Sequence, residues 1–523
     1  MRWDALAVFI FFFLLVTVLG FIAARWRRGD LNLLHEWGLA GRRFGTLITW
    51  FLLGGDLYTA YTFIAIPAAM YGTGAVSGFF AIPYTILIYP LVYLLMPKFW
   101  SVCKQRGYVT ASDFVRDRFG SKGLALAVAF TGILATMPYI ALQMYGIQVS
   151  LAALGIPLSV PILGIHVDIP LLIAFVILAA YTYTSGLRAP AMIALVKDLM
   201  IFIVLFAAII IIPARLGGFA PIFGAAQQKA IANPKTFSAL IPKNSYVAYA
   251  TLALGSAMAL FLYPHSITGV LSSSGTKIVK RNAALLPIYS LMLGFLAFLG
   301  YMAIAAKVPL IPGFAANSAI PSLFNVEFPG WFAGFAFAAL SIGALVPAAV
   351  MSIAAANLFT RNIYKEYVRR NATDYEEARV AKLSSLVVKF GALLFIVLIQ
   401  PSQVVYFQLL GGIWILQTLP SVFLGLYTNW FNRWALIIGW AVSMIAGTYL
   451  FIAAGDKPTA SVLGVPVYTA VTVLILNVVL AIILTPIFEA IGARRGQDVT
   501  HSSDYEEEYA PIESSETGQE ALG

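Results

Sequence analysis

The sequence contains very little cysteine and histidine. Its 523 residues include one cysteine, Cys103, and four histidines: His35, His166, His265 and His501. A single cysteine excludes both a disulfide framework and a thiolate metal cluster. The histidines lie too far apart in sequence to match a zinc-ligand spacing. The chain also lacks the Gly-x-x-x-x-Gly-Lys-[Ser/Thr] motif, which argues against an ATP-driven pump. We therefore expect no metal centre, beyond a weak Na⁺ site, and no cofactor.

Charged residues are also scarce, at 11% of the chain against 60% apolar residues. Soluble domains carry roughly 25% charged residues, so the composition favours a membrane protein. The formal net charge is +10. The positive residues are spread over short loops between apolar segments, which encodes topology and argues against a nucleic-acid partner. With no nucleophile–base pair and no soluble segment of enzymatic size, the sequence also argues against an enzyme.

Long apolar segments fill most of the chain. Many have the roughly 20 residues that a membrane-spanning helix needs. The first lacks a small-residue cleavage site and is followed by arginines, so we expect it to be a retained span. We predict an all-α polytopic membrane protein of about thirteen spans, near residues 4–24, 44–72, 75–97, 123–154, 169–187, 190–213, 247–272, 285–306, 331–357, 383–400, 403–428, 434–454 and 465–488.

The distribution of lysine and arginine predicts the orientation. Loops after odd-numbered spans, with the C-terminal tail, hold 24 of the 33 lysines and arginines, and the loops on the other side hold 7. Positive loops stay in the cytoplasm. We therefore expect a multi-pass protein of the cell (inner) membrane with its N-terminus outside and its C-terminus in the cytoplasm. The long loop 214–246, with four positive residues, is the one exception.

Two of the expected spans carry helix breakers. The second has Gly-Gly-Asp at residues 54–56 and Pro67 further on, and the seventh has Pro264 followed by histidine. Unwound backbone in a membrane is tolerated where it lines a cavity. Two broken helices at matching positions indicate a five-plus-five inverted-repeat transporter. The core repeats would cover about 44–213 and 247–428. Glycine and proline are common in membrane helices, so each break alone also has a purely structural reading.

The remaining segments are short. We expect residues 1–495 to form a single transmembrane transporter domain and residues 496–523 to form an acidic, disordered cytoplasmic tail. Residues 98–122 read as a cytoplasmic surface helix that Thr110 begins with a cap, and residues 358–382 as a charged connector.

Few ionisable residues lie inside the expected spans. A charge in the bilayer is costly, so such residues usually face a partner or a cavity. Asp56 lies near the middle of its span, beside the Gly-Gly break, and we expect a functional role for it. Lys197 and Asp198 could act in ion coupling or form a local ion pair. Lys389 can reach the interface and reads as structural. His265 could titrate near neutrality or be a neutral imidazole bonded across helices.

Several stretches resemble the solute:sodium symporter family, and within it the branch of acetate, pyruvate and lactate permeases. They follow one another in the family order from about residue 36 to 440. The stretches are GYVTASDFVRDRFGS at 107–121, YTSGLRAPAMIALVKDLM at 183–200, YPH at 263–265, PAAVMSIAAANLFTRNIYKEYVRR at 347–370 and LGLYTNWFNRWALIIGW at 424–440. The resemblance implies the five-plus-five core, alternating access and cation-driven uptake.

The family's sodium site uses backbone carbonyls of core helix one and hydroxyls of core helix eight. The resemblance assigns these roles to carbonyls near Gly54, Leu57 and Ala349 and to the hydroxyl of Ser352. The chain departs from the family where a second hydroxyl is replaced by Ile353 and a threonine by Lys197. A hard cation needs oxygen ligands, so both changes weaken the case for Na⁺.

We therefore expect a secondary active symporter that couples H⁺ or Na⁺ influx to uptake of a small organic anion, most simply a short monocarboxylate. Lys197, paired with Asp198, could replace sodium as the titrating group. Half-helix N-termini at the breaks would attract a carboxylate. Polar residues near them are candidate substrate ligands, although core packing explains the tyrosines equally well: Tyr139, Gln143, Tyr263, His265 and Gln417.

The alternatives differ in substrate or in class. A Na⁺-coupled symporter for proline or pantothenate would share the fold. A solute-sensing receptor would need a signalling domain, for which the tail after residue 489 is too short. A passive channel would conduct without a gradient requirement. The lipid bilayer and a small solute are the expected partners, and no obligate protein partner is expected.

Overall fold

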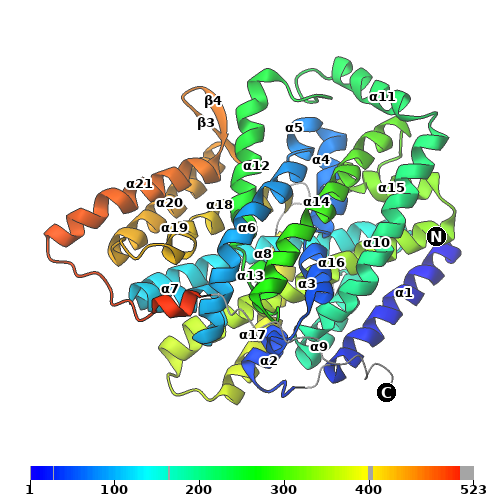
Figure 1. The fold of residues 1–523 in the computed structure, drawn as a ribbon. Helices are drawn as coiled ribbons and strands as arrows, with labels where there is room; N and C mark the ends of the chain where they lie inside the picture. Colours follow the sequence, from blue (N-terminus) through cyan, green and yellow to red (C-terminus); the bar gives the residue numbers. More distant parts are fainter. Residues whose placement is uncertain (1, 27–28, 159, 163–164, 399–403, 507–523) are drawn as a thin grey trace, which may run out of the picture.

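The computed structural model describes residues 2–506, except for 27–28, 159, 163–164 and 399–403. Packed helices make up almost all of this part of the chain (Figure 1). The strands form two short antiparallel hairpins, β1 (Val160–Ile162) with β2 (Ile165–Val167) and β3 (Thr459–Val462) with β4 (Val465–Tyr468). The first hairpin lies in a connection between expected spans, whereas the second extends from such a connection into the first residues of the expected span 465–488, and neither was predicted.

Most of the expected spans correspond to single helices. These are α1 (Trp3–Ile22), α6 (Ala81–Gln105), α8 (Lys122–Ala153), α9 (Ile169–Ser185), α10 (Arg188–Arg215), α14 (Thr276–Ala305), α16 (Gly330–Phe359), α17 (Asp374–Leu398), α20 (Arg433–Ala453) and α21 (Thr469–Ala490). By length and composition, eight helices of the described chain could cross a membrane, or up to ten if bent pairs count as spans. The polytopic all-α class is thus confirmed, and the count of thirteen stays a prediction.

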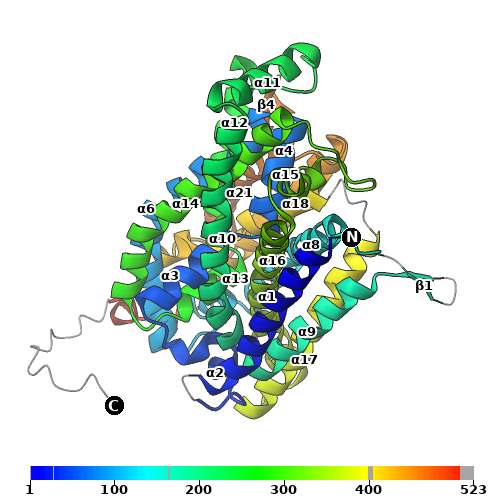
Figure 2. The same cartoon turned by 90° about the vertical axis from the view of Figure 1, so that its right-hand side faces the viewer.

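Shorter helices connect or complete these spans. They are α2 (Leu34–Leu39), α3 (Thr46–Gly55), α4 (Ile66–Gly72), α5 (Ala75–Gly78), α7 (Ala111–Phe119), α11 (Phe219–Ala232), α12 (Tyr246–Leu260), α13 (Pro264–Leu271), α15 (Ala319–Glu327), α18 (Val404–Leu416) and α19 (Leu419–Val422). Helix α16 lies at the centre of the molecule, between α1, α8 and α10 (Figure 2), and every residue of its most apolar 18-residue segment is buried.

The first broken span consists of α3 and α4. Helix α3 ends at Gly55, and a π-helix over Tyr61–Ala65 leads into α4. Side chains satisfy the backbone donors of the break: the N–H of Ala60 donates to Gln143 Oε1 at 2.9 Å, and that of Tyr61 to Thr59 Oγ1 at 3.0 Å. A helix can therefore open here without leaving these backbone donors unpaired. Pro67, expected to contribute to the break, lies inside the regular helix α4.

The second broken span consists of α12 and α13, which meet at an angle of 49°. Tyr263 has extended dihedral angles (φ −59°, ψ 137°), as expected for the residue before a proline. The break predicted at Pro264 is therefore confirmed. A third bend, of 40°, separates Tyr406–Leu416 from Leu419–Leu426 and was not predicted. Pro420, in the first turn of α19, accounts for it.

Two short backbone bridges connect the segments that flank the two broken spans. Phe44, before α3, forms a parallel bridge with Ser273, after α13. Gly74, after α4, forms a parallel bridge with Ser238, which precedes α12. In each bridge the segment before one span meets the segment after the other. This exchange is what an inverted repeat requires, because its two halves run in opposite directions through the membrane.

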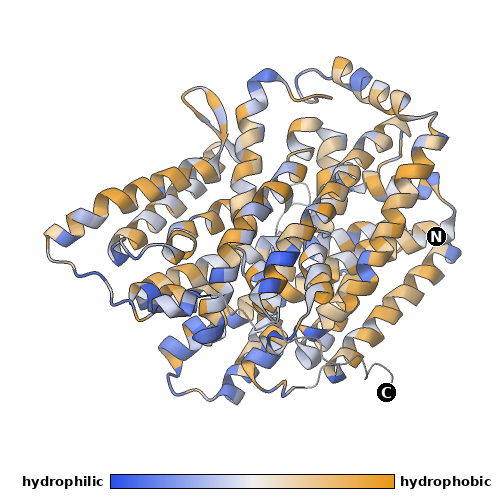
Figure 3. Ribbon diagram, viewed as in Figure 1, coloured by the Kyte–Doolittle hydropathy of each residue, from blue (hydrophilic) through white to orange (hydrophobic). Residues whose placement is uncertain are grey.

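The polar connections lie on two sides of the molecule. Helix α11 and the β3–β4 hairpin, from loops expected outside, lie at the top of Figure 1. Helices α2 and α7, from segments expected in the cytoplasm, lie in the lower half, together with α17, whose first residues, 374–382, belong to the expected cytoplasmic connector. Hydrophilic residues concentrate at these two ends, with hydrophobic ribbon between them (Figure 3). Loops expected on the same side of the membrane thus lie at the same end of the structure.

The cytoplasmic surface helix is shorter than expected, because α6 continues to Gln105. Thr110 begins α7 with a capping box, as the sequence predicts. The start of the acidic tail packs against this helix. Arg118 contacts Asp498 at 2.7 Å, and Arg106 contacts Asp504 at 2.7 Å. The tail was expected to be disordered from residue 496, whereas its described residues, up to 506, follow a defined path on α7; residues 507–523 lie outside the described chain.

Candidate functional site

Lys197 lies on α10 and reaches the break of the first broken span. Its ammonium donates hydrogen bonds to the carbonyl of Gly55 and, at 3.1 Å, to that of Tyr58. It also lies 3.3 Å from Asp198 Oδ1. The side chains of Lys197 and Asp198 are both fully buried. Three oxygen atoms therefore surround an ammonium that has three N–H bonds.

Two tyrosines complete this cluster. The hydroxyl of Tyr289, on α14, donates to Asp198 Oδ2 at 2.9 Å. The hydroxyl of Tyr58 donates to the backbone carbonyl of Tyr289 at 2.9 Å. Sequence reasoning missed both tyrosines, since nothing in their local sequence separates them from core aromatics. A side chain at Gly55 would meet the carboxylate of Asp198 and the amine of Lys197 at 2.9 Å. The glycine thus lets the lysine approach the helix break.

The carbonyls expected to bind an ion differ by one residue from those at the cluster. We expected Gly54 and Leu57 to contribute. The carbonyl of Gly54 instead accepts from the N–H of Leu57 at 2.9 Å, and that of Leu57 accepts from Thr62 Oγ1 at 2.9 Å. The carbonyls of Gly55 and Tyr58 are the ones that accept hydrogen bonds from the Lys197 ammonium. The break begins after Gly55, so its carbonyl is the one left without a helical partner.

The two positions expected on α16 do not meet the cluster. The hydroxyl of Ser352 donates to the carbonyl of Ala349 at 2.8 Å, within its own helix. The part of α16 beside the cluster is Gly343, where an added β-carbon would lie 3.8 Å from the Tyr58 carbonyl oxygen. Ser352 follows Gly343 by nine residues, about 13 Å along a helix. The ion-site roles expected for Ala349 and Ser352 stay predictions, and the Ser352 hydroxyl is engaged within α16.

Gly343 has a property that the sequence could have revealed. Pro347 stands four residues later inside α16. A proline has no N–H, so it leaves the carbonyl four residues before it without its helical hydrogen bond. Gly343 thus combines a carbonyl without its helical partner with a position near the Tyr58 carbonyl.

Asp56 and His265 form a second buried cluster, between the two broken spans. The Nε2 atom of His265 lies 3.4 Å from Asp56 Oδ2, and the hydroxyl of Ser266 lies 3.3 Å from the same oxygen. Within the described chain, Asp56 Oδ1 and His265 Nδ1 are buried without a hydrogen-bond partner. Unpaired buried polar atoms are costly, so they mark a place where a proton, water or solute can bind.

A chamber lined by tyrosines adjoins this cluster. The ring of Tyr139 contacts the His265 ring edge-on, with 5.5 Å between centroids, and the ring of Tyr263 lies tilted against it, with 5.3 Å between centroids. The hydroxyl of Tyr263 is buried without a partner in the described chain. The chamber has a volume of about 30 Å³ and is also lined by Tyr61, Tyr84, Ser256, Gln408, Gly412 and Tyr468. This volume holds one or two water molecules, so the helices must separate to admit a solute.

The two glutamines expected as substrate ligands have structural partners. Gln143 uses its Oε1 to accept the N–H of Ala60 in the first break. Gln417 donates to the carbonyl of Ile413 at 2.9 Å, and its own carbonyl accepts from Asn477 on α21 at 2.9 Å. Of the five expected substrate residues, the structure thus brings together Tyr139, Tyr263 and His265.

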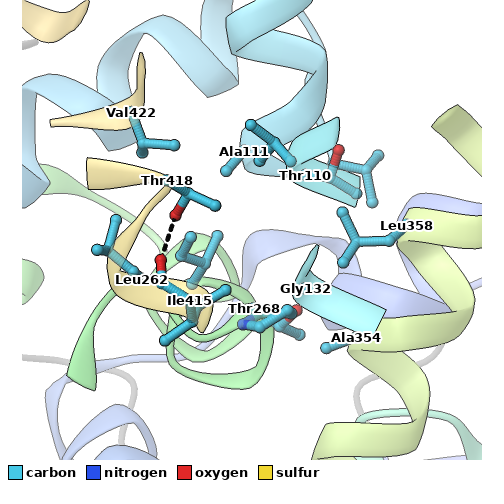
Figure 4. Close-up of a pocket in the computed structure, with 14 residues that line it drawn as sticks. Thr110, Ala111, Gly132, Leu262, Thr268, Ala354, Leu358, Ile415, Thr418 and Val422 are labelled. Atoms are coloured by element: carbon cyan, nitrogen blue, oxygen red, sulfur yellow. Dashed lines mark hydrogen bonds between the residues drawn. The ribbon is translucent and has the colours of Figure 1, made fainter. Parts of the chain in front are cut away.

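A second small cavity lies on the α7 side of the broken spans (Figure 4). Its volume is about 20 Å³, and it extends from Pro264 and Thr268 to Thr110 and Leu358. Thr418 lies on its wall, and its hydroxyl donates to the carbonyl of Ile415 at 2.7 Å. The cavity and the tyrosine chamber share the second broken span as a wall.

Known proteins with similar sequences are transporters. The profile of the sodium:solute symporter family matches residues 37–447. A monocarboxylate transport permease protein of Rhizobium johnstonii is 54% identical over 492 residues, which cover 93% of this chain and 97% of that protein. A sodium/proline symporter of Haemophilus influenzae is 23% identical over 396 residues, covering 73% of this chain and 74% of that protein.

The fold also matches a solved transporter structure. A Na⁺-coupled sialic acid symporter, in a substrate-bound outward-open state, has a TM-score of 0.70 at 19% identity. The match covers 93% of this chain and 98% of the other. The family expected from the motifs, and the expectation of a membrane-embedded transporter rather than an enzyme, are confirmed: the chain belongs to the sodium:solute symporter family.

Proposed function

We propose that this symporter takes up a short monocarboxylate together with protons, and that Lys197 is the group that couples the two. The observation that carries the proposal is the set of oxygens around the Lys197 ammonium. The Gly55 and Tyr58 carbonyls and the Asp198 carboxylate are the kind of ligands that Na⁺ would need. Here the positively charged Lys197 ammonium binds these oxygens itself.

The ammonium also supplies a coupling mechanism. When protonated, it ties the first broken span to α10 through the carbonyls of Gly55 and Tyr58, while Asp198, its neighbour on α10, supplies the counter-charge. A neutral amine has two N–H bonds for these three acceptors and no charge, so its hydrogen bonds to the two carbonyls are weaker and the Asp198 carboxylate loses its counter-ion. The broken span is then free to shift. Loading the proton from outside and releasing it inside would couple this shift to the proton gradient.

The chamber beside His265 supports a small anionic substrate. The N-terminus of α13 begins at Pro264 and carries a partial positive charge. The unpaired Tyr263 hydroxyl and His265 Nδ1 offer polar contacts beside it. The permease from Rhizobium, at 54% identity, is named for monocarboxylate transport.

A Na⁺-coupled mechanism is the second candidate. Gly343 on α16 lies near the Tyr58 carbonyl, and Pro347 leaves the Gly343 carbonyl without its helical hydrogen bond, so this carbonyl is the proposed additional ligand for Na⁺. In that case Lys197 would be a structural partner of Asp198. The substrate could then be another small solute, such as proline or pantothenate.

Uptake into proteoliposomes distinguishes the two candidates. Radiolabelled lactate, pyruvate, proline and pantothenate would be offered with a proton gradient or a Na⁺ gradient imposed separately. Protein-free liposomes are the control, because undissociated acids cross bilayers unaided. We expect lactate or pyruvate to accumulate with the proton gradient alone. Strict Na⁺ dependence at fixed pH, retained in Lys197→Met, would decide for the second candidate.

The proposed orientation has the N-terminus outside, the C-terminus in the cytoplasm and the protein in the inner membrane, with residues 1–495 as one transmembrane domain. Reporter fusions after residues 38 and 280 should indicate the cytoplasm, and fusions near 160 and 320 the outside. A reversed pattern would overturn the orientation. Termini on the same side would overturn the count of thirteen spans.

A further inference from the structure

One residue of the tyrosine chamber comes from outside the predicted core repeats. Among the described residues that line the chamber, Tyr468 alone lies beyond the repeats at 44–213 and 247–428. It is the last residue of β4, and α21 begins directly after it. The β3–β4 hairpin packs on α12 at the end of the molecule that the proposed orientation places outside (Figure 1). Tyr468 therefore approaches the chamber from its outer side.

Tyr468 connects α12 to α18, two helices that form walls of the chamber. Its backbone N–H donates to Thr251 Oγ1 on α12 at 3.0 Å, and its hydroxyl donates to the carbonyl of Leu409 on α18 at 3.1 Å. The side chain is only 1% exposed. One buried residue thus bonds to both helices, so moving α12 away from α18 breaks at least one of these two hydrogen bonds.

Two glycines provide the space for this side chain. A β-carbon at Gly255 on α12 would lie 2.6 Å from Tyr468 Cδ1, and one at Gly412 on α18 would lie 2.7 Å from the Tyr468 hydroxyl oxygen. Both distances are shorter than a van der Waals contact, so a larger residue at either position would displace the tyrosine. The Tyr263 hydroxyl would lie 3.9 Å from the same β-carbon at Gly412. The hydroxyls of Tyr468 and Tyr263 therefore face the same point of α18.

We propose that Tyr468 is a positioning residue for transport, which holds α12 against α18 and keeps the outer side of the chamber shut until a solute enters. The chamber of about 30 Å³ has room for one or two water molecules, so its walls must separate to admit a solute. A hydrogen bond between neutral groups shifts such an equilibrium by about two- to tenfold. The Tyr468 hydroxyl can therefore favour the closed state and still release α18 in every transport cycle.

The inference rests on the proposed function only in treating the chamber as part of the solute path. It names neither the solute nor the coupling ion. Its test therefore measures the opening of the chamber directly, without a solute and without an imposed gradient.

Thiol labelling of the purified full-length protein in lipid nanodiscs measures this opening. The single cysteine, Cys103, is buried, and Cys103→Ser provides a background without thiols. Ser256→Cys in that background places a thiol on the wall of the chamber. The rate at which a small, charged methanethiosulfonate reagent modifies this thiol reports how often the chamber opens.

The test variant is Tyr468→Phe, which removes the hydroxyl and keeps the ring between the two glycines. The matched control is Tyr249→Phe, because Tyr249 also lies on α12 and its hydroxyl donates to the carbonyl of Phe79 at 3.2 Å, outside the chamber lining. Thr251→Val is a second test variant, since it removes the acceptor at the α12 end of the link with little change of shape. Thermal unfolding of each variant shows that it is folded.

We expect the labelling rate to rise by about fivefold in Tyr468→Phe, to rise in Thr251→Val, and to stay at the background value in Tyr249→Phe. An unchanged rate in Tyr468→Phe would overturn the proposal, because the hydroxyl would then not hold the helices together. An equal rise in Tyr249→Phe would also overturn it, because it would indicate a general loosening of α12. Lactate uptake by wild-type protein tests the proposed function separately, and its absence would leave the labelling result intact.

Discussion

Two buried carboxylates lie near the same helix break and have different surroundings. Asp198 has Lys197 at 3.3 Å and the Tyr289 hydroxyl at 2.9 Å. The Oδ1 atoms of both carboxylates lack a hydrogen-bond partner in the described chain, but Asp198 Oδ1 faces the Lys197 ammonium, whereas Asp56 has His265 and Ser266 at its Oδ2, at 3.4 and 3.3 Å. Asp198 thus belongs to a compact charge cluster, whereas Asp56 lies beside His265, whose ring contacts two tyrosines that line the chamber proposed for substrate.

This difference indicates a division of labour. The Lys197–Asp198 pair on α10 holds the first broken span and α14 through its hydrogen bonds to the Gly55 and Tyr58 carbonyls and to the Tyr289 hydroxyl, so a change of charge at Lys197 suits coupling. A partly unpaired carboxylate beside a histidine can exchange a proton or accept a solute contact, so Asp56 suits the substrate side. The following variants test this division, from the largest expected effect to the smallest.

Lys197→Met should have the largest effect. Removing one partner of a buried pair leaves an uncompensated charge and costs about 3–5 kcal/mol in unfolding free energy. Gradient-driven uptake should be lost, measured in proteoliposomes together with the amount of folded protein. In Lys197→Met/Asp198→Asn the stability should largely recover while uptake stays absent. Recovery of uptake in the double variant would contradict a coupling role for the lysine.

Asp56→Asn should abolish accumulation with a smaller cost in stability. The amide keeps the size of the side chain and can still contact Ser266, so the protein should remain folded in the membrane. A midplane carboxylate is retained where it acts. Uptake under a proton gradient and thermal unfolding are the measurements. Concentrative uptake close to wild type would return Asp56 to a structural role.

Tyr289→Phe should have an intermediate effect. It removes the hydroxyl that donates to Asp198 and leaves the ring in place. A hydrogen bond to a charged group contributes about 1.5–3 kcal/mol. We expect a lower rate of gradient-driven uptake and a shifted pH dependence, because Asp198 would interact differently with Lys197. The control is Tyr301→Phe, on the same helix, whose hydroxyl donates to Ala239 in a connection far from the cluster in sequence. Equal pH profiles of uptake in Tyr289→Phe and Tyr301→Phe would contradict a role of the Tyr289 hydroxyl at Asp198.

Ser352→Ala should have the smallest effect. The Ser352 hydroxyl donates to the carbonyl of Ala349 in its own helix, and its loss costs about 1 kcal/mol or less. Uptake and its dependence on Na⁺ and on protons should stay within about twofold of wild type, because the hydroxyl bonds only within its own helix in the described chain. Gly343→Val, in contrast, should impair transport, because a side chain there would crowd the Tyr58 carbonyl. Loss of Na⁺ dependence in Ser352→Ala would restore the residue to an ion site.

The sequence predicted the elements of the site better than their partners. Asp56, Lys197 and Asp198 are conspicuous because charge is rare in an apolar span, and all three lie at the broken span. The ligands of the cluster are backbone atoms, which carry no residue signature. The carbonyls assigned at the first break, those of Gly54 and Leu57, were therefore each one residue before the ones that bind Lys197, and the roles expected for Ala349 and Ser352 stay predictions. Tyr58 and Tyr289 could not be distinguished from other tyrosines without their distances to Asp198.

The sequence alone determined the membrane class, the family, the break at Pro264 and the buried charges, because hydropathy, proline and charge act locally along the chain. Only the tertiary structure decided that Lys197 occupies the Gly55 and Tyr58 carbonyls, that Gln143 caps the first break and that Gln417 bonds to α21. These contacts join helices more than 50 residues apart in sequence. They depend on how the helices pack and rotate, which no local pattern of residues specifies.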